Sequence, residues 1–292
     1  MKYLVIISLI AAITVAGCTG QTAAKDKTQI QPTTGKNITI YAISVSSNAL
    51  FIDTEGTDVL YDAGDWKDSS TVIDYISKFN ITNLTLVPSH HHMDHIGGMI
   101  GVLDKMDVKN VLDSGLQYTT KIFTQFIEKA KAKNFIVVKR GDIFALDNGV
   151  TIEILHPGKT DANGVNSSYY FDDENDNSIV MKLTYYNFTM LFTGDCEKTC
   201  ENDIIKSGVN LKSDILSVGH HGSRTSTSDS FLNAVSPKAA TIGVALDNQY
   251  GHPHQETISK LNAKHIPIYR TDLNGNIKIN TDGVRYDIIP EK

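Results

Sequence analysis

The sequence has few cysteines, a single tryptophan and no excess of positive charge. It contains three cysteines in 292 residues, and its 27 lysines and arginines are outnumbered by 33 aspartates and glutamates. The formal net charge of −6 excludes a global positive field that would attract nucleic acid, so a polyanionic substrate has to be held by local groups. The cysteines are not spaced like the ligands of a structural zinc finger. The hydrophobic content of 41% is ordinary for a globular protein.

The N-terminus has the features of an export signal. Apolar residues fill most of positions 4–16, between Lys2 and the pair Gly17-Cys18. Val15-Ala16-Gly17-Cys18 also resembles a bacterial lipobox, which implies cleavage before Cys18, a lipid on that cysteine and an extracytoplasmic location at the cell membrane. The alternatives are a plain secretory signal and an uncleaved anchor, for which the run is short against the ~20 residues of a membrane span.

This pattern divides the chain into regions. Residues 1–17 are predicted to be a lipoprotein signal peptide, residues 18–36 a flexible tether rich in Thr, Gln and Lys, and residues 37–292 one folded domain. Within that domain, Cys196 and Cys200 are four residues apart. Their spacing permits a disulfide outside the cell, and two unpaired thiols on a helix surface are the alternative.

Hydrophobic periodicity predicts a mixed β and α domain. It begins with an antiparallel meander of strands at 38–42, 49–53 and 59–62. Helices are then expected at 71–79, from about 97 and at 119–132, between strands at 84–87, 135–138, 150–155, 179–185, 188–192 and 215–218. A polar stretch at 161–176, with three aromatic residues at 169–171, is expected to form a long surface loop. Asn274-Gly275 predicts a hairpin turn near the C-terminus.

Histidines carry the strongest functional pattern. Eight of the ten fall into clusters after a predicted strand or beside Gly or Pro, at 90–95, 220–221 and 252–254. His90 and His92 share a face of an extended segment, because alternate side chains point the same way, and two imidazoles can thus bind one metal ion. Asp94 and His95 come where the chain turns into a helix, so they can face a second ion. This mixture of ligands suits Zn²⁺, Mn²⁺ or Fe²⁺.

These residues resemble the metallo-β-lactamase superfamily. The first motif is the His-x-His-x-Asp-His spacing of residues 90–95, followed by Gly-Gly. Asp195 in Thr193-Gly194-Asp195 matches the family's carboxylate that bridges two metals, and His220 in Gly219-His220-His221-Gly222 matches its late histidine ligand. Asp62 matches an early supporting aspartate, which orients the ligands. The resemblance covers about residues 37–289 and implies an α/β fold, a four-layer αββα sandwich, with two divalent metal ions.

Within the superfamily the sequence resembles in particular the C-terminal hydrolase domain of the ComEC family of competence proteins. The segments that carry this likeness are Asn175-Asp176-Asn177-Ser178-Ile179-Val180, His220-His221-Gly222-Ser223-Arg224-Thr225-Ser226 and Tyr250-Gly251-His252-Pro253-His254. The likeness implies nuclease or phosphodiesterase activity, with DNA as a candidate substrate. The acidic balance of the chain argues against an unselective DNA binder, which normally shows a basic stripe.

One motif departs from the superfamily pattern. Many members supply a further histidine to the first metal from a Gly-His-Thr segment, and Asp176-Asn177-Ser178 stands at the corresponding place here. Asp176 or a water molecule is expected to replace that histidine. His156 is a less suitable candidate, because its His-Pro-Gly context also fits a turn. More oxygen ligands favour Mn²⁺, so both Zn²⁺ and Mn²⁺ stay open.

The resemblance and the residue chemistry together predict a role for each site residue. The metal ligands are expected to be Asp176 and the set His90, His92, Asp94, His95, Asp195 and His220. Asp94 also orients the nucleophile, and His252 or His254 protonates the leaving oxygen or binds a phosphate. Substrate contacts are expected from His221, Ser223 and Arg224. The structural alternatives are that His252 and His254 cap the fold and that Arg224 is a solvated loop residue.

Two other functions compete with the nuclease, because fold does not select among the chemistries of the superfamily. A phosphorylcholine or wall-polymer phosphoesterase would use Tyr169, Tyr170 and Phe171 for cation–π contact. The second alternative is a metal-stabilised binding module without catalysis, although a merely structural site does not need an open two-metal arrangement. The pattern of residues implies no protein partner.

Overall fold

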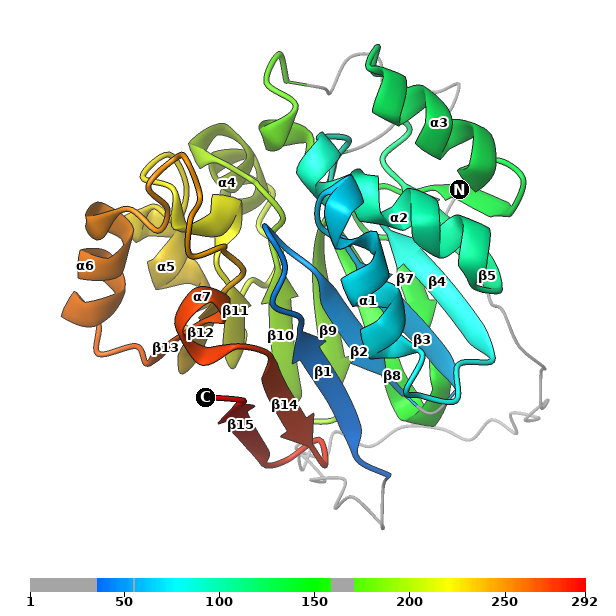
Figure 1. Cartoon of the computed structure of the whole chain (residues 1–292). Coiled ribbons are helices and arrows are strands. Elements are labelled where there is room, and N and C mark those ends of the chain that lie inside the picture. The colour runs from blue at the N-terminus through cyan, green and yellow to red at the C-terminus, as the bar shows by residue number, and fades with distance from the viewer. Residues whose placement is uncertain (1–35, 55, 159–170) are drawn as a thin grey trace, which may run out of the picture.

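A computed structural model describes residues 36–54, 56–158 and 171–292 (Figure 1). The predicted signal peptide, the predicted lipid attachment site Cys18 and nearly all of the predicted tether lie outside these residues, as do Tyr169 and Tyr170. None of the helices in the described part of the chain is long and apolar enough to cross a membrane.

Two β-sheets form the centre of the molecule. The first sheet has the order β15-β14-β1-β2-β3-β4-β5-β6, and the second has the order β13-β12-β11-β10-β9-β8-β7. The strands of the first sheet are β1 Ile38–Ala42, β2 Leu50–Asp53, β3 Thr57–Tyr61, β4 Asn83–Val87, β5 Val108–Asp113, β6 Asn134–Val137, β14 Ile277–Thr281 and β15 Tyr286–Pro290. Those of the second are β7 Ile143–Ala145, β8 Val150–His156, β9 Val180–Tyr185, β10 Phe188–Phe192, β11 Ile215–Ser217, β12 Ala239–Ile242 and β13 Ile268–Arg270.

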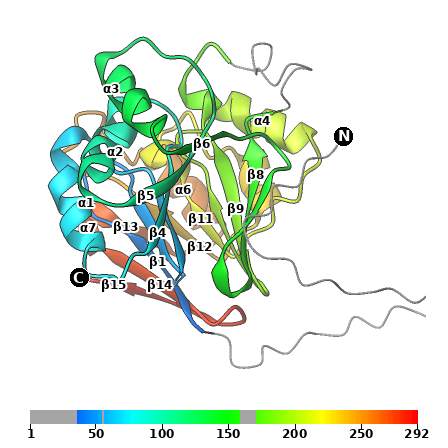
Figure 2. The same cartoon turned by 90° about the vertical axis from the view of Figure 1, so that its right-hand side faces the viewer.

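Helices cover the outer faces of both sheets (Figures 1 and 2). On the first sheet lie α1 Ser69–Ile76, α2 Met93–Lys105 and α3 Lys121–Ala130, and on the second lie α4 Lys198–Lys206, α5 Asp229–Val235 and α6 Gln255–Ala263. The short helix α7 Thr271–Asn274 connects the sheets, and single 3₁₀ turns occur at η1 Trp66–Asp68, η2 Asp147–Gly149, η3 Asn175–Asn177 and η4 Gly219–Gly222. The predicted αββα sandwich is therefore confirmed.

Alternation along the strands divides the core into three layers. In β1, Ile38 and Ile40 face the second sheet, where they join a buried cluster with Met181 and Met190, whereas Tyr41 packs under the helices of the first sheet. Successive side chains of a strand point to opposite faces, so both faces of each sheet are apolar and both are covered.

One predicted turn is wrong: residues 271–274 form α7, and Gly275 (φ +66°) ends that helix instead of turning a hairpin.

The ends of the parallel strands decide where the histidine motifs meet. β3 runs parallel to β4, and β10 runs parallel to β11. The carboxyl ends of each pair therefore lie at one edge of their sheet, where α/β proteins commonly bind ligands. The aspartate and histidine motifs at 62, 90–95, 195 and 220–221 directly follow β3, β4, β10 and β11.

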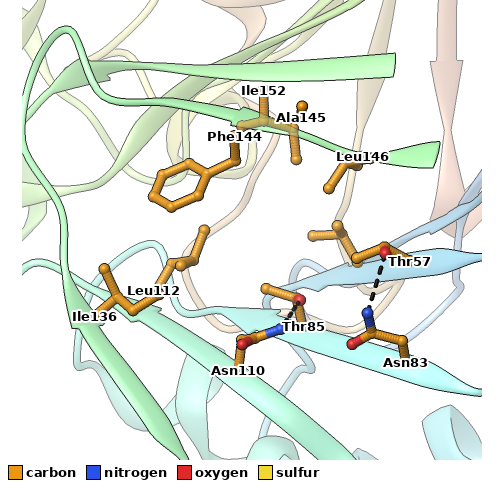
Figure 3. A pocket seen from close by; sticks show the side chains of 11 residues that line it. Thr57, Asn83, Thr85, Asn110, Leu112, Ile136, Phe144, Ala145, Leu146 and Ile152 are labelled. Carbon is orange, nitrogen blue, oxygen red and sulfur yellow. Dashed lines mark hydrogen bonds between the residues drawn. The ribbon is translucent and has the colours of Figure 1, made fainter. Parts of the chain in front are cut away.

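A cavity between the sheets lies away from these motifs (Figure 3). It is lined at the starts of β3 and β4 by Thr57 and Asn83, which share a hydrogen bond of 3.0 Å, and across the gap by Phe144 of β7 and Ile152 of β8. None of its lining residues belongs to a histidine cluster. This cavity is therefore separate from the predicted site.

The start of α2 is fixed to the loop after β3 by close backbone contact. The amide of Ala63 donates to the carbonyl of His95 at 3.0 Å, and the amide of Gly98 donates to the carbonyl of Gly64 at 3.1 Å. A methyl group on Gly98 would overlap the carbonyl oxygen of Ala63. The glycine pair after the histidine motif thus lets the helix approach the neighbouring loop.

We expect Gly98→Ala to destabilise the protein by about 1–3 kcal/mol, the usual cost of overpacking a close contact. Urea unfolding followed by circular dichroism measures this loss. Lys105→Ala, at an exposed position of the same helix, should change the midpoint little. An unchanged midpoint for Gly98→Ala would show that the helix has room at this contact.

Candidate functional site

The loop between β4 and α2 brings three histidines together. His90 is 1% exposed, and its Nε2 lies 2.9 Å from Nδ1 of His92, the residue that caps the N-terminus of α2. The two nitrogens converge, as the alternation of an extended segment predicts. His95 lies in the first turn of α2 and is fully buried, and its ring lies 4.2 Å from that of His90.

Asp195 occupies the centre of the cluster. It follows β10 and is 3% exposed. Its neighbour Gly194 has φ +53°, and a side chain there would overlap Ser89, so only glycine suits this position. One oxygen of Asp195, Oδ2, is surrounded by four imidazole nitrogens, with distances of 3.3 Å to His95, 3.6 Å to His221, 3.7 Å to His220 and 3.9 Å to His90.

The adjacent residues His220 and His221 have different partners. Nδ1 of His221 lies 2.9 Å from the carbonyl oxygen of Gly243, which can only accept a hydrogen bond. Nδ1 is therefore protonated, and the lone pair of Nε2 faces Asp94 and Asp195, each 3.6 Å away. Nδ1 of His220 lies instead 2.8 Å from Oε1 of Glu197.

Both histidines have left-handed backbone angles, with φ of 49° for His220 and 51° for His221. Such conformations are costly for residues other than glycine and persist where the surroundings enforce them, commonly at functional sites. The sequence analysis predicted His220 as a metal ligand and His221 as a substrate contact. The structure groups His221, not His220, with Asp94 and His95.

The cluster fits metal ions. Two groups have ligand atoms within 4.8 Å of one another: His90, His95 and Asp195, and Asp94, His95 and His221. Nε2 of His95, Nε2 of His221 and Oδ1 of Asp195 are all buried without a hydrogen-bond partner within the described chain. Buried polar atoms normally have partners. Three unpaired ligand atoms on side chains that meet at one point therefore suit a bound cation.

The ionisable groups of the cluster strongly shift one another's pKa values. Burial alone would raise the pKa of Asp195, but the imidazoles of His95, His221 and His220 lower it well below its usual value. Burial alone would lower the pKa of His95, but the carboxylates of Asp195, Asp62 and Asp94 raise it well above its usual value. The carboxylates are thus held ionised, which is the form that binds cations.

Asp62 orients His95 from behind. This fully buried carboxylate accepts the amide of Ser89 at 2.7 Å and the side-chain amide of Asn48 at 3.1 Å, and it lies 2.9 Å from Nδ1 of His95. It therefore holds the Nδ1 proton and leaves Nε2 facing the cluster, where a metal ion can displace its proton. The supporting role predicted for Asp62 agrees with this geometry.

His91 belongs to the loop but points away from the cluster, and its partners were not predicted. Its Nε2 lies 2.9 Å from Asp113, and its Nδ1 lies 3.3 Å from Glu174. Burial alone would lower the pKa of His91, but these two carboxylates raise it to about 9. The pair of charges anchors the loop to β5 and to the segment before η3. No local sequence pattern connects these three distant residues.

Asp176 is not placed with the cluster, in contrast to its predicted role. Its Oδ1 accepts the backbone amides of Glu197 at 3.1 Å and Cys200 at 3.0 Å, at the N-terminus of α4. A carboxylate is stabilised there by the free amides and the helix dipole. His156 also lies outside both groups: its Nδ1 is 2.8 Å from the carbonyl oxygen of Ser178, and its ring stacks on Phe171.

The third histidine cluster lies beside the first two. The half-buried ring of His252 is 5.3 Å from that of His220 and 6.1 Å from that of His221. Burial, and then the charges of His220 and His221, lower the pKa of His252 to about 4. His254 accepts the amide of Arg224 at 3.1 Å and is the residue at the N-cap position of α6, where its side chain makes no capping hydrogen bond. His252 therefore adjoins the candidate ligands, whereas His254 also has a structural role.

The remaining predicted residues have varied surroundings. The hydroxyl of buried Ser223 lies 2.9 Å from that of Thr225, so it supports its own loop. Arg224 is exposed and its guanidinium lies 3.4 Å from Glu256.

The open question about the two cysteines is resolved, because Cys196 and Cys200 form a disulfide. Glu197, between them, was not predicted, although its position two residues after Asp195 could have indicated it.

Comparisons with known proteins identify the family of this chain. The family model described as the metallo-beta-lactamase superfamily matches residues 43–245. ComE operon protein 3 of Bacillus subtilis (strain 168) is 30% identical over 241 residues, which cover 78% of this chain and 30% of that protein. Competence protein ComA of Neisseria gonorrhoeae is 30% identical over 233 residues, which cover 79% of this chain and 30% of that protein. The predicted resemblance to competence proteins is thus confirmed.

These relatives are much longer, and this chain spans about 30% of their length. A solved structure with a similar fold is Igni18, a metallo hydrolase from Ignicoccus hospitalis, with a TM-score of 0.54 and 14% sequence identity. The likeness covers 82% of this chain and 98% of that one. At this identity it shows the shared fold alone.

We expect Asp62→Asn to weaken Zn²⁺ binding by about 10- to 100-fold, the usual effect of losing a group that orients a metal ligand. The amide cannot take the Nδ1 proton of His95 in the same way, so His95 no longer presents its Nε2 lone pair. Equilibrium dialysis measures the dissociation constant. Asp58→Asn, at a buried aspartate near the start of the same strand, is the matched control and should bind Zn²⁺ normally. Equal affinity of all three proteins would contradict the orienting role.

Proposed function

We propose, because this chain belongs to the metallo-β-lactamase superfamily, that it is a metal-dependent hydrolase that cleaves phosphodiester bonds, with DNA as the first candidate substrate. The observation that carries the proposal is the buried cluster around Asp195, where three ligand atoms lack hydrogen-bond partners. The similarity to competence proteins favours a phosphodiester over the other esters that this fold hydrolyses. The acidic net charge means that local groups hold such a substrate.

The proposed site holds two divalent ions, Zn²⁺ or Mn²⁺. His90 and His92 would bind one ion, and Asp94, His95 and His221 would bind the other. Oδ2 of Asp195 lies within 4 Å of nitrogen atoms from both sets, so Asp195 would bridge the ions. Two such ions lower the pKa of a bound water and neutralise charge on a phosphoryl oxygen.

The chain's own residues would position the reactants. The side chain of Asp94 is 41% exposed, so its carboxylate can accept a hydrogen bond from the attacking water and fix its direction. His252 is half-buried beside the cluster, where the N–H of its neutral ring can donate a hydrogen bond to the leaving oxygen. Glu197 orients His220 beside the bridging carboxylate. Arg224, exposed beside His254, would contact a further phosphate.

The proposed location is the outer side of the cell membrane, with a lipid on Cys18. The N-terminal sequence pattern supports this location, and the disulfide between Cys196 and Cys200 supports it as well, because disulfides persist in oxidising compartments. The phosphorylcholine alternative has less support, since Phe171 stacks on His156. The other two aromatic residues of that hypothesis lie outside the described chain.

Hydrolysis of bis(p-nitrophenyl) phosphate and of linear DNA, each with Mn²⁺ or Zn²⁺, tests the proposed function. We expect turnover by the wild-type protein and at least about a 100-fold lower kcat/KM for Asp94→Asn, which weakens both the ligand set and the orientation of water. Asp104→Asn, at an exposed position of the same helix, is the control and should retain full activity.

Other substrates separate the alternatives. Hydrolysis confined to p-nitrophenyl phosphorylcholine would identify the choline or wall-polymer phosphoesterase instead. Metal binding without turnover of any phosphoester or of nitrocefin would identify the binding module. Either outcome would overturn the phosphodiesterase proposal.

The two adjacent histidines provide a separate prediction. We expect His221→Ala to release one of two bound ions, because its Nε2 lone pair faces Asp94 and Asp195. His220→Ala should retain both ions, because His220 belongs to neither group of candidate ligands among the described residues. Metal content after dialysis, measured by atomic absorption, distinguishes the variants. Loss of the ion from His220→Ala alone would restore the assignment made from the sequence.

A further inference from the structure

The segment immediately after Asp195 is closed by a disulfide. Cys196 is the next residue, and its partner Cys200 lies in the first turn of α4. Both are buried, at 1% and 0% exposure, in the core between the second sheet and its helices. Nothing in the proposed chemistry uses these sulfur atoms. The covalent link nevertheless begins one residue away from the carboxylate at the centre of the cluster.

Hydrogen bonds hold the same segment from outside. The amide of Asp195 donates to the hydroxyl of Ser178 at 3.0 Å. The amides of Glu197 and Cys200 both donate to Oδ1 of Asp176, at 3.1 and 3.0 Å. Asp176 therefore spans the segment, and the disulfide joins its two ends. The buried carboxylate that was predicted to bind metal instead stabilises the backbone that carries Asp195.

The segment carries two groups of the site. Asp195 presents Oδ2 to the four imidazoles, while its buried Oδ1 has no hydrogen-bond partner in the described chain. Glu197 accepts hydrogen bonds through Oε1 from His220 at 2.8 Å and from the hydroxyl of Thr225 at 2.7 Å. A buried carboxylate with an unpaired oxygen tends to turn toward water unless its backbone is restrained. The restraint on this backbone therefore affects the positions of the Asp195 and Glu197 carboxylates.

We propose that the Cys196–Cys200 disulfide is a positioning element of the metal site, which holds Asp195 and Glu197 in place so that metal ions bind tightly. The inference rests on the metal site of the proposed function. A role in global stability alone fits less well, because the effect of a disulfide on the unfolded chain grows with the length of the loop that it closes. This loop joins residues only four apart in sequence.

The proposal makes metal affinity dependent on redox state. A dithiol reductant supplies two electrons and two protons, so the S–S bond breaks, two thiols form on Cys196 and Cys200, and the reductant becomes a disulfide. The backbone between the two cysteines then loses its covalent link and is held by hydrogen bonds, such as those to Asp176 and from Lys198 to the carbonyl of Thr225. Asp195 and Glu197 gain freedom to move away from the histidines.

The test compares Zn²⁺ binding by the wild-type protein and by the double variant Cys196→Ala/Cys200→Ala. We expect the dissociation constant of the more weakly held ion to rise by about tenfold, as for the loss of other groups that orient metal ligands. Amide hydrogen exchange without metal should also become faster at Glu197, because its segment is released. If the variant does not accumulate, wild-type protein reduced in place and freed of reductant under argon gives the same comparison.

Ile204→Val is the matched control. Ile204 is a fully buried residue of α4 in the same core cluster as both cysteines, and that cluster contains none of the proposed metal ligands. This substitution lowers stability but leaves the disulfide intact, so Zn²⁺ affinity should stay unchanged. A similar loss of affinity in Ile204→Val would assign the effect to general destabilisation and overturn the proposal.

The same measurements separate this inference from the proposed function. Equal Zn²⁺ affinity with and without the disulfide would overturn the positioning role alone and leave the hydrolase untouched. Wild-type protein that binds no Zn²⁺ or Mn²⁺ would overturn both. Tight binding by the wild type, weaker binding by the double variant and normal binding by Ile204→Val would support the disulfide as part of the site.

Discussion

The carboxylate of Asp195 is buried among four imidazoles, and the arrangement of the site depends on this cluster of charge. Burial opposes the ionised form, but His95, His221 and His220 reverse that effect and lower the pKa of the carboxyl. The carboxylate in turn raises the pKa of His95. Such a group of charges is stable in a core only when each is compensated. The unpaired ligand atoms that remain face one shared space, and this makes the cluster suitable for cations.

The two sheets supply the two halves of this cluster. Asp62 and His90 follow strands of the first sheet, and Asp195 and His221 follow strands of the second. Each half is useful only if the sheets meet in a defined position, which the apolar layer between them secures. In the first half, the close contact of Gly98 with the loop after β3 fixes the start of α2. In the second half, the disulfide and Asp176 restrain the backbone next to Asp195. The positions of the candidate ligands therefore depend on contacts that restrain the backbone away from the ligand atoms themselves.

These supports explain how ordinary residues acquire specific roles. Asp62 and the carbonyl of Gly243 each occupy Nδ1 of one histidine, so that His95 and His221 turn Nε2 toward the cluster. His91, by contrast, is turned away between Asp113 and Glu174 and anchors the loop. Neighbouring histidines of one motif thus differ in function because of their partners, not because of their chemistry.

The sequence by itself determined the fold class, the strand and helix pattern and most members of the cluster. Strand alternation and the spacing of His90, His92, Asp94 and His95 are local properties, and the family motifs indicated Asp195. Only the tertiary structure grouped His221 with Asp94 and His95, placed Asp176 at the N-terminus of a helix and joined the two cysteines. The reason is physical: a side chain's role depends on which distant groups occupy its hydrogen-bonding positions. Short-range sequence patterns do not contain those contacts, which arise when the two sheets pack together.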